Sequence, residues 1–487
     1  MTIRPLSFKL LSCLGGIGIL ASCTTVGHDY QGPPAGPQTS AFTRGAELAN
    51  ANASTQMLAR WWTALGDPTL DSLIERSLHA NPNLDIARAR LRQARASLRG
   101  ERAKRLPNGN ASALAAHANL PTIGGDSGQE QGGGISLPSS LNLYNVGFDA
   151  TWEIDLFGGQ RRATEAAGAT AQAAEANLAD AQLSLTAEIA QAYVNLRATQ
   201  ARLALSAAAI ERQQRILDLT TQRARSGTAS ELDLVRLQGQ LETTRFEAEP
   251  LQAQLDTYHD ELGALVGVAP GALDAELGVS ETGARAVPMP PAAVAVGDPA
   301  AMLRRRPDIR AAERTLAARN AQIGQAEAAR FPRISFMGLI GIGGTHIRDL
   351  THLDDFSAIV APQLSWNVLD LGRVAASVEQ AEGVRDEAEA HYRSTVLGAL
   401  RDAEDALSRF RQRRISVATI ARVKASAERA ATLTAARQHA GTASLIDVLD
   451  TERQQFAAEQ NLVQAQAGLT GGFIALHKAL GLGWEAQ

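Results

Sequence analysis

Residues 227–230 read Gly-Thr-Ala-Ser, and the same four residues recur in the same order at 441–444. The offset of 214 positions extends well beyond this tetrapeptide, because residues 152–267 align without a gap to 366–481. Each aligned copy begins with a tryptophan and ends with a glycine. Self-similarity at a fixed offset indicates that one structural unit occurs twice along the chain.

The duplication continues upstream at a different offset. Asn81-Pro82 matches Arg306-Pro307 at 225 positions, and this offset holds as far as residues 105–107 and 330–332. The difference of 11 residues lies between the two alignments, where the first copy carries runs of glycine. Glycine runs are typical of loops, so the insertion is confined to a loop and both copies are predicted to share one fold.

Each copy is predicted to have the order helix, strand, loop, strand, very long helix, tight turn and return helix. The first helices, 83–105 and 308–330, lack internal proline. The very long helices cover about 160–226 and 374–440, and a helix of that length measures roughly 100 Å. Pro250 is predicted to break or kink the first return helix. Apolar residues recur every seven positions in the first copy, which predicts antiparallel coiled-coil packing: Ile189, Leu196, Leu203, Ile210 and Leu217, then Leu234, Leu241, Ala248, Leu255 and Leu262.

Strands are expected at about 107–120, 143–155, 332–345 and 356–368. Three of them show period-two alternation of apolar and other residues, whereas the first is mostly Ala and Gly. This alternation is typical of a membrane β-barrel, although a half-buried sheet of a soluble protein gives the same pattern. The apolar faces comprise Tyr144, Val146, Phe148, Ala150 and Trp152; Ile334, Phe336, Ile340 and Ile342; and Phe356, Ala358, Val360, Pro362, Leu364, Trp366 and Val368.

The number of strands is too small for a closed barrel. Unpaired backbone groups at a sheet edge cost several kcal/mol each in lipid, and closed membrane barrels have at least about eight strands. If these strands lie in a membrane, the chain must therefore form an oligomer. Two copies would supply eight strands, three would supply twelve and four sixteen, and the strands themselves do not choose among these.

Composition narrows the class of protein further. The chain has 487 residues, of which 45% are hydrophobic but only 4% aromatic. Its 47 basic and 51 acidic residues nearly balance, which argues against nucleic acid as a partner. After residue 23 no stretch is apolar enough over ~20 residues to form a membrane-spanning helix. No His or Cys pattern typical of a metal site occurs, and no catalytic constellation is found, so we expect no enzymatic activity.

The N-terminus has the features of a secretory signal. Arg4 and Lys9 precede a short apolar run at 10–20, which is followed by Leu20-Ala21-Ser22-Cys23. The last four residues resemble a bacterial lipobox. That resemblance implies cleavage before Cys23, an S-diacylglycerol group and an N-palmitoyl group on this cysteine, and retention at the outer membrane. We expect no other cofactor.

The lipobox, Trp61-Trp62, Asp67-Pro68, the twofold repeat and the Gly-Thr-Ala-Ser turns together resemble the outer-membrane factor family, in particular TolC-like and OprM-like lipoproteins of tripartite efflux systems, including the NodT type. The resemblance implies an α+β membrane protein. Three copies would form one twelve-stranded outer-membrane β-barrel, continued into the periplasm by an α-helical barrel. It also implies a periplasmic adaptor and an inner-membrane pump of the RND type as partners.

The resemblance assigns a role to each part of the chain. The expected divisions are a lipoprotein signal peptide at 1–22, a lipid-anchored linker at 23–60, the first repeat at 61–270, an inter-repeat linker at 271–297 and the second repeat at 298–482. The expected function is a passive exit duct for small toxic compounds or drugs. Two alternatives stay open, namely an exit duct for type I protein secretion and a periplasmic coiled-coil adaptor or spacer lipoprotein without a barrel.

The two tight turns are the first candidate site. Their glycines suit the positive φ that follows a long helix, and their serines suit the N-cap of the next helix, with Asp233 and Asp447 three residues further on. This pattern predicts helix capping, and the family resemblance adds adaptor docking at the same periplasmic tips. The docking residues would be Gly227, Thr228, Ala229, Ser230, Gly441, Thr442, Ala443 and Ser444.

Asp447 and Asp450 form the second candidate site, which the family resemblance assigns to the closed periplasmic gate. Their spacing places them on one helix face, and in a trimer they would gather six carboxylates around one axis. Crowded carboxylates repel one another, which favours bound cations and raised pKa values. The first repeat has Asp233 but Arg236 at the partner position, so only the second repeat provides both acids.

A basic stripe on the first helix has no assigned role. It consists of Arg88, Arg92, Arg95, Arg99 and Arg102, with Lys104 and Arg105 beyond them. A solvated face or pairing with a neighbouring helix explains the stripe, and a tunnel lining that attracts anionic cargo is the alternative.

Overall fold

The computed structural model describes residues 25–34, 41–45, 59–119, 140–278, 286–294, 296 and 298–484. The signal peptide, Cys23 and the glycine-rich insertion of the first repeat lie outside these residues. The elements in chain order are η2 (Trp61–Leu65), α3 (Pro68–Ala80), α4 (Pro82–Ala103), β1 (Asn108–Asn119), β2 (Ser140–Ile154), α5 (Gly159–Arg225), α6 (Glu231–Val266), α7 (Asp274–Leu277), α8 (Pro299–Arg305), α9 (Pro307–Ala328), β3 (Arg333–Gly344), η3 (Ile347–Thr351), η4 (Leu353–Asp355), β4 (Phe356–Ser365), α10 (Arg373–His439) and α11 (Leu445–Ala479).

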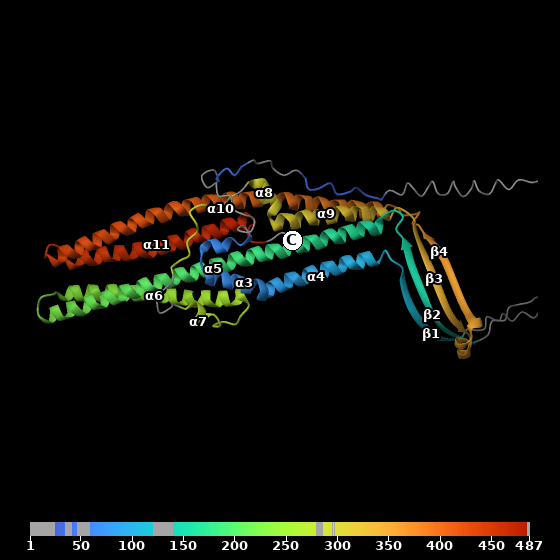
Figure 1. Ribbon diagram of the computed structural model, residues 1–487, viewed down its shortest axis with the longest axis horizontal. Helices are drawn as coiled ribbons and strands as arrows, with labels where there is room; N and C mark the ends of the chain where they lie inside the picture. The colour runs from blue at the N-terminus through green and yellow to red at the C-terminus, as the bar shows by residue number, and fades with distance from the viewer. Residues whose placement is uncertain are drawn as a thin grey trace, which may run out of the picture. The chain divides into compact units, whose positions relative to one another are not determined.

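The two repeats share one order of main helices and strands, and several of the matched elements have equal lengths (Figure 1). Helices α4 and α9 have 22 residues each, strands β1 and β3 have 12, and helices α5 and α10 have 67. Helices α6 and α11 return from the tight turns over 36 and 35 residues. Pro250 lies inside α6 without breaking it, so the predicted break is wrong. None of the described helices combines the length and the apolar composition that a bilayer-spanning helix requires.

The compact units of the chain do not follow the repeats. One unit contains residues 92–172 and 314–390, with the segment up to Pro33, and therefore holds all four strands. The other contains residues 34–91, 173–313 and 391–487, and holds both tight turns. Each unit takes matched parts from both repeats, so the duplicated halves build each unit together.

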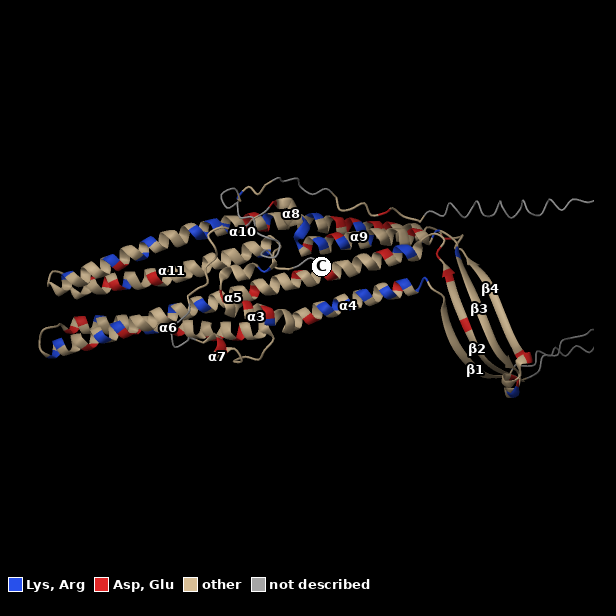
Figure 2. Ribbon diagram, viewed as in Figure 1, with Lys and Arg blue, Asp and Glu red and all other residues tan. Residues whose placement is uncertain are grey.

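The four strands form one antiparallel sheet in the order β1-β2-β3-β4. The register sets Val146 opposite Ile342, and Ile342 opposite Phe356. Directly paired residues share one face of a sheet, so the predicted apolar faces of β2, β3 and β4 merge into a single surface. Much of it is exposed in the protomer, with Val146 at 51% and Phe356 at 54%. Figure 2 shows few charged residues on these strands.

Matching contacts fix the corner between the first helix and the sheet in both repeats. The indole Nε1 of Trp152 donates to the backbone oxygen of Arg105 at 3.0 Å, and that of Trp366 donates to the backbone oxygen of Arg330 at 3.2 Å. Strand β4 ends at Ser365. Trp366 therefore lies after the strand, not inside it as the alternation predicts, because its partner strand β3 begins at Arg333, opposite Ser365.

A second pair of matching contacts joins each return helix to the start of the first helix of its own repeat. The Nδ2 of Asn81 donates to the backbone oxygen of Leu265 at 2.8 Å, and the Nη1 of Arg306 donates to that of Ala479 at 2.9 Å. These residues are equivalent under the two sequence offsets. The same joint is thus built by an amide in one repeat and by a guanidinium in the other.

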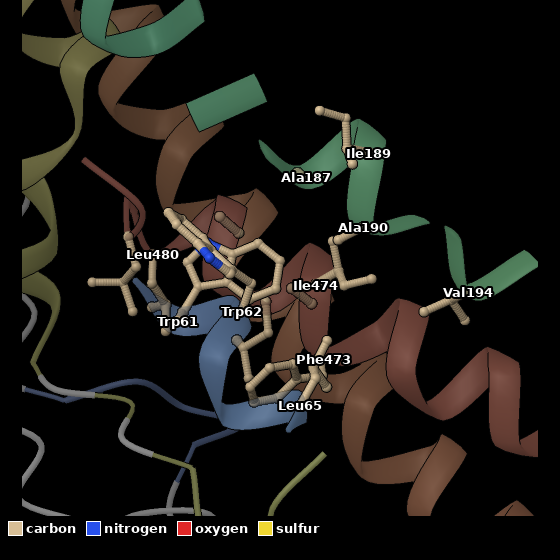
Figure 3. Packing of buried hydrophobic residues seen from close by; sticks show 14 of the residues in the cluster. Trp61, Trp62, Leu65, Ala187, Ile189, Ala190, Val194, Phe473, Ile474 and Leu480 are labelled. Carbon is tan, nitrogen blue, oxygen red and sulfur yellow. The ribbon is translucent and has the colours of Figure 1, made fainter. Parts of the chain in front are cut away.

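The main core belongs to the unit that holds the tight turns, where aromatic side chains gather around Trp61 (Figure 3). Trp61 is only 2% exposed and packs edge-on against Trp62 and Phe473. Asp67 connects this region to α5, because its carboxylate caps α3 and also accepts from the hydroxyl of Tyr193 at 2.7 Å. Burial of the Tyr193 hydroxyl, with its hydrogen bond to Asp67, raises its pKa to about 12.

His477 contributes an ionisable imidazole ring to this aromatic cluster. Its Nδ1 lies 2.8 Å from the backbone oxygen of Phe473, and its ring is 5.3 Å from that of Trp61. A neutral ring satisfies this carbonyl by donating Nδ1–H. Burial, which disfavours the charged form, lowers the pKa of His477 to about 4.

The buried His477 predicts a loss of stability in acid. The unfolded chain binds a proton near pH 6.5 whereas the folded chain does not until about pH 4. Stability is therefore fully present above pH 6.5 and falls as the pH drops toward 4, by up to roughly 3 kcal/mol. We expect His477→Gln to flatten this dependence in thermal unfolding followed between pH 7 and 4.5.

The exposed His79 provides the control for this prediction. His79→Gln should keep the acid sensitivity of the unmodified protein. An equally steep fall in the His477→Gln protein would show that other groups cause it.

Candidate functional site

The two tight turns have nearly identical backbones. Gly227 and Gly441 adopt φ angles of +73° and +74°, the left-handed region that glycine enters at little cost. The next residue closes each turn onto the preceding long helix: Thr228 donates its N–H to the oxygen of Arg223 at 2.8 Å, and Thr442 does the same to Arg437 at 2.9 Å. The positive φ that the sequence predicted for the two glycines is confirmed.

Both return helices begin with the capping pattern that the sequence predicts. Ser230 accepts from the backbone N–H of Asp233 at 3.1 Å, and the Asp233 carboxylate accepts in return from the Ser230 backbone N–H. Ser444 and Asp447 repeat the arrangement, with the return bond at 2.9 Å. Each pair satisfies two backbone donors that a helix start leaves unpaired.

The two candidate gate acids already have local partners within one protomer. Hydrogen bonds from the backbone and hydroxyl of Ser444 hold the pKa of Asp447 below its usual value in the protomer. The rise predicted for six carboxylates gathered in a trimer stays a prediction. Asp450 accepts from Arg453 at 2.8 Å and from Gln454 at 2.7 Å. In the protomer the capping role of Asp447 is therefore the one that the geometry supports.

Exposed apolar side chains flank the tips at equivalent positions. Leu232 is 56% exposed and Ile446, its counterpart 214 residues later, is 47% exposed. Val235, one turn further along α6, is 61% exposed. These residues are not part of a polar motif, and the signal for them in the sequence is that Leu232 and Ile446 match at the offset of 214.

A buried arginine holds the segment that follows Cys23. Arg162, whose side chain is only 4% exposed, donates from Nε to the oxygen of Val26 at 2.9 Å and from Nη2 to that of Gly27 at 2.7 Å. It also forms ion pairs with Asp29 and Glu165. We call this group of contacts the Arg162 clamp.

The Arg162 clamp requires two close backbone approaches. The N–H of Val26 donates to the oxygen of Phe157 at 3.0 Å. At Gly27, which has a φ of +84°, an added Cβ would lie 2.6 Å from the Cα of Gly324, so both positions need glycine. The clamp has no signature in the sequence, because an arginine at the start of a helix, such as Arg162, is usually a surface residue.

The basic stripe lies on α4. Arg92, Arg99 and Arg102 are exposed in the protomer, and Arg88 bonds to Asp85 at 2.9 Å and to the backbone oxygen of Leu78. Lys104 pairs with Glu101 at 2.7 Å. The solvated and locally paired face therefore describes the stripe in a single protomer.

A scan of the chain against protein-family models matches the outer membrane efflux protein family over residues 73–268 and 299–482. The chain belongs to this family. The two matched segments correspond to the two repeats, and the family consists of transport channels rather than enzymes. Membership assigns the chain to the outer membrane as an efflux channel, and favours that function over the coiled-coil spacer.

Curated relatives align over almost their whole length. Nodulation protein T of Rhizobium leguminosarum bv. trifolii is 30% identical over 96% of this chain and 96% of the relative. Outer membrane protein OprJ of Pseudomonas aeruginosa is 30% identical, again over 96% of both chains. The antibiotic efflux pump outer membrane protein ArpC of Pseudomonas putida is 30% identical over 98% of this chain and 96% of the relative.

Solved outer-membrane channels share the fold. The channel OprN matches with a TM-score of 0.83 and 34% identity, over 95% of this chain and all of that one. The open state of the Neisseria gonorrhoeae MtrE channel matches with a TM-score of 0.78 and 25% identity, over 95% and 99% of the two chains. The tandem-repeat α+β architecture predicted from the sequence is thus confirmed as that of an outer-membrane channel.

The tips predict a difference between two glycine-to-alanine substitutions in or beside α10. Gly441→Ala places a Cβ in the left-handed region, which costs about 1 kcal/mol although no atom lies within 4 Å. Gly398→Ala, inside α10 and equally unobstructed, should favour the helix by up to about 1 kcal/mol. We expect faster amide hydrogen exchange around the tip in the first variant only. Equal exchange in both variants would contradict the left-handed assignment.

Proposed function

We propose that three copies of this chain form one exit duct, in which twelve strands close a barrel in the outer membrane and the long helices continue it into the periplasm. The duct is passive, and an inner-membrane pump of the RND type delivers the cargo through a periplasmic adaptor. The exported cargo consists of small toxic compounds, a class supported by the name of the antibiotic efflux relative.

The incomplete sheet carries the proposal. Among the described strands, β1 and β4 each pair on one side only, while apolar side chains such as Val360 and Leu364 are 77% and 66% exposed. An open edge with an apolar face is unfavourable in water and in lipid alike. Pairing β4 of one copy with β1 of the next would satisfy both edges and place the apolar face against lipid.

The lipid anchor on Cys23 is supported by the Arg162 clamp. Thr25 lies two residues after Cys23, and Arg161 donates to its hydroxyl at 3.3 Å. Two residues extend at most about 7 Å, so the acyl chains would begin close to the corner where β2 passes into α5. That corner is where a strand leaves the bilayer, which suits a lipid inserted in the adjacent leaflet.

The tips are the proposed docking sites for the adaptor. Residues 227–230 and 441–444 are mainly exposed, and Leu232 and Ile446 add apolar surface beside them. Ordered turns with fixed caps present the same shape in every copy, which lowers the entropic cost of binding. Asp447 and Asp450 of three copies form the proposed gate, and assembly would add the repulsion that the single protomer lacks.

The exit-duct proposal is tested with the purified full-length protein. We expect a trimer by native mass spectrometry, a mobility on gels that changes with heating, and channel conductance in planar bilayers. A stable monomer without conductance that high salt releases from membranes would overturn the proposal.

The anchor predicts separable effects of two substitutions. Cys23→Ala should abolish metabolic labelling with palmitate, while the segment from Thr25 onward stays bound. Arg162→Gln should keep the label but expose residues 25–34 to limited proteolysis, because it removes several bonds of a buried guanidinium. Arg161→Gln, which removes one contact at 3.3 Å, is the control and should remain resistant. Labelling that persists without Cys23 would refute the anchor.

The gate predicts higher conductance when its charges are removed. Asp447→Asn combined with Asp450→Asn should raise the current in planar bilayers at neutral pH, because the uncharged ring no longer retains the cations that crowded carboxylates bind at the constriction. Asp233→Asn is the matched control, since it alters an equivalent cap that has Arg236 in place of a second acid. Unchanged currents in the double variant, or an equal rise in the control, would remove the gate assignment.

A further inference from the structure

A charged cavity of about 710 Å³ lies in the unit that holds the tight turns. It is lined by α5 and α6 of the first repeat and by α10 and α11 of the second. The ionisable lining consists of five cationic side chains and two carboxylates: Arg202, Arg306, Arg409, Arg413, Lys478, Asp402 and Asp405. The cavity therefore carries an excess of positive charge.

Of these five cations, only Arg306 forms an ion pair within the described part of the chain. The guanidinium of Arg306 donates to both carboxylate oxygens of Asp308, at 3.0 and 2.6 Å. The Nε of Arg202 donates to the side-chain oxygen of Gln460 at 2.8 Å. Arg409 and Arg413, by contrast, have no hydrogen-bond or ion-pair partner in the described part of the chain, and both are exposed. Asp402 pairs with Arg401 outside the cavity lining. Asp405, the other carboxylate of the lining, forms no ion pair with Arg409 or Arg413 in the described part of the chain.

Glycines on α11 make room for these side chains. A Cβ added at Gly468 would collide with the guanidinium of Arg413, and one added at Gly471 would lie 2.7 Å from the Oε1 of Gln191. Glycine is among the least favourable residues in a helix interior. Its presence here keeps the wall of the cavity open.

The first repeat shows that the fold does not need this arrangement. At the equivalent positions it has Asn195 and Thr199 where the second repeat has Arg409 and Arg413, and Gln254 where the second has Gly468. The same pair of helices forms in both repeats. The arginines and the glycine are therefore features of this site and not of the helical scaffold.

We propose that the cavity is a binding site for small organic anions that carry at least two carboxylate or phosphate groups. Arg409 and Arg413 are four residues apart on α10, which places them on one helix face. Each guanidinium can hold one anionic group through paired hydrogen bonds. The partly enclosed setting, in which burial lowers the pKa of Arg202, strengthens such bonds over those in open water.

The site gives the cargo of the proposed duct a chemical class, and in that respect it rests on the proposed function. Anionic compounds delivered to the duct would bind at a cationic site to which both repeats contribute residues. Weak binding by a pair of exposed arginines allows release, which a passive duct requires.

The test is a titration of the full-length protein in detergent with citrate and, separately, with inorganic pyrophosphate at low ionic strength. We expect saturable binding of one or both probes, and their relative affinity separates a carboxylate site from a phosphate site. Arg409→Gln combined with Arg413→Gln should weaken binding at least tenfold. Arg414→Gln, a neighbouring exposed arginine outside the cavity lining, should leave it unchanged.

A second variant keeps the proposal testable if the double variant does not fold. Gly468→Gln installs the residue that the first repeat has at this position, fills the wall and displaces Arg413, so it should also weaken binding at least tenfold. No saturable binding by the unmodified protein, or equal binding by Gly468→Gln, would overturn the site.

Bilayer recordings separate this inference from the proposed function. We expect the double arginine variant to conduct, but with a reversal potential in a KCl gradient shifted toward cation selectivity. A protein that conducts yet neither binds the probes nor shifts its selectivity refutes only the anion site. A protein that binds citrate but does not conduct refutes only the duct.

Discussion

The open edges of the sheet are the constraint on which the rest of the structure depends. Strands β1 and β4 each leave one row of backbone groups unpaired within the described chain, and the apolar face beside them is largely exposed. Backbone groups must be satisfied wherever water is excluded. Membership of a family of outer-membrane channels explains this otherwise unfavourable surface, because a sheet that is incomplete in one copy becomes a wall segment in an assembly.

Duplication supplies a regular frame, and substitution within the copies supplies the differences. The corner tryptophans, the tips and the joints between helices recur at equivalent positions. Where a contact can be made by different chemistry, as with Asn81 and Arg306, the two copies have diverged without changing the joint. At the cavity, Arg409, Arg413 and Gly468 of the second copy replace Asn195, Thr199 and Gln254 of the first, so the two copies differ there in charge.

Much of the fold could be predicted because its signals are local and repeated. The long helices, the glycine turns and the serine–aspartate caps depend on residues close in sequence, and a second copy confirms each pattern. The Arg162 clamp could not be predicted, since it joins residues more than 130 positions apart. The predicted end of β4 lies too far along the chain because alternation within one strand does not reveal where its partner begins, and β3 begins at Arg333, opposite Ser365. The direction of the Asp447 pKa shift depends on the cap rather than on charge alone.

The clamp on Arg162 also has a mechanical consequence. An acyl chain joined to a protein by a long flexible linker holds the protein at the membrane but does not orient it. Here the tether would be two residues long and would end in a guanidinium held by carbonyls on both sides of a glycine. With so short a connection, the lipid would fix the depth of each subunit in the leaflet before its neighbours join it.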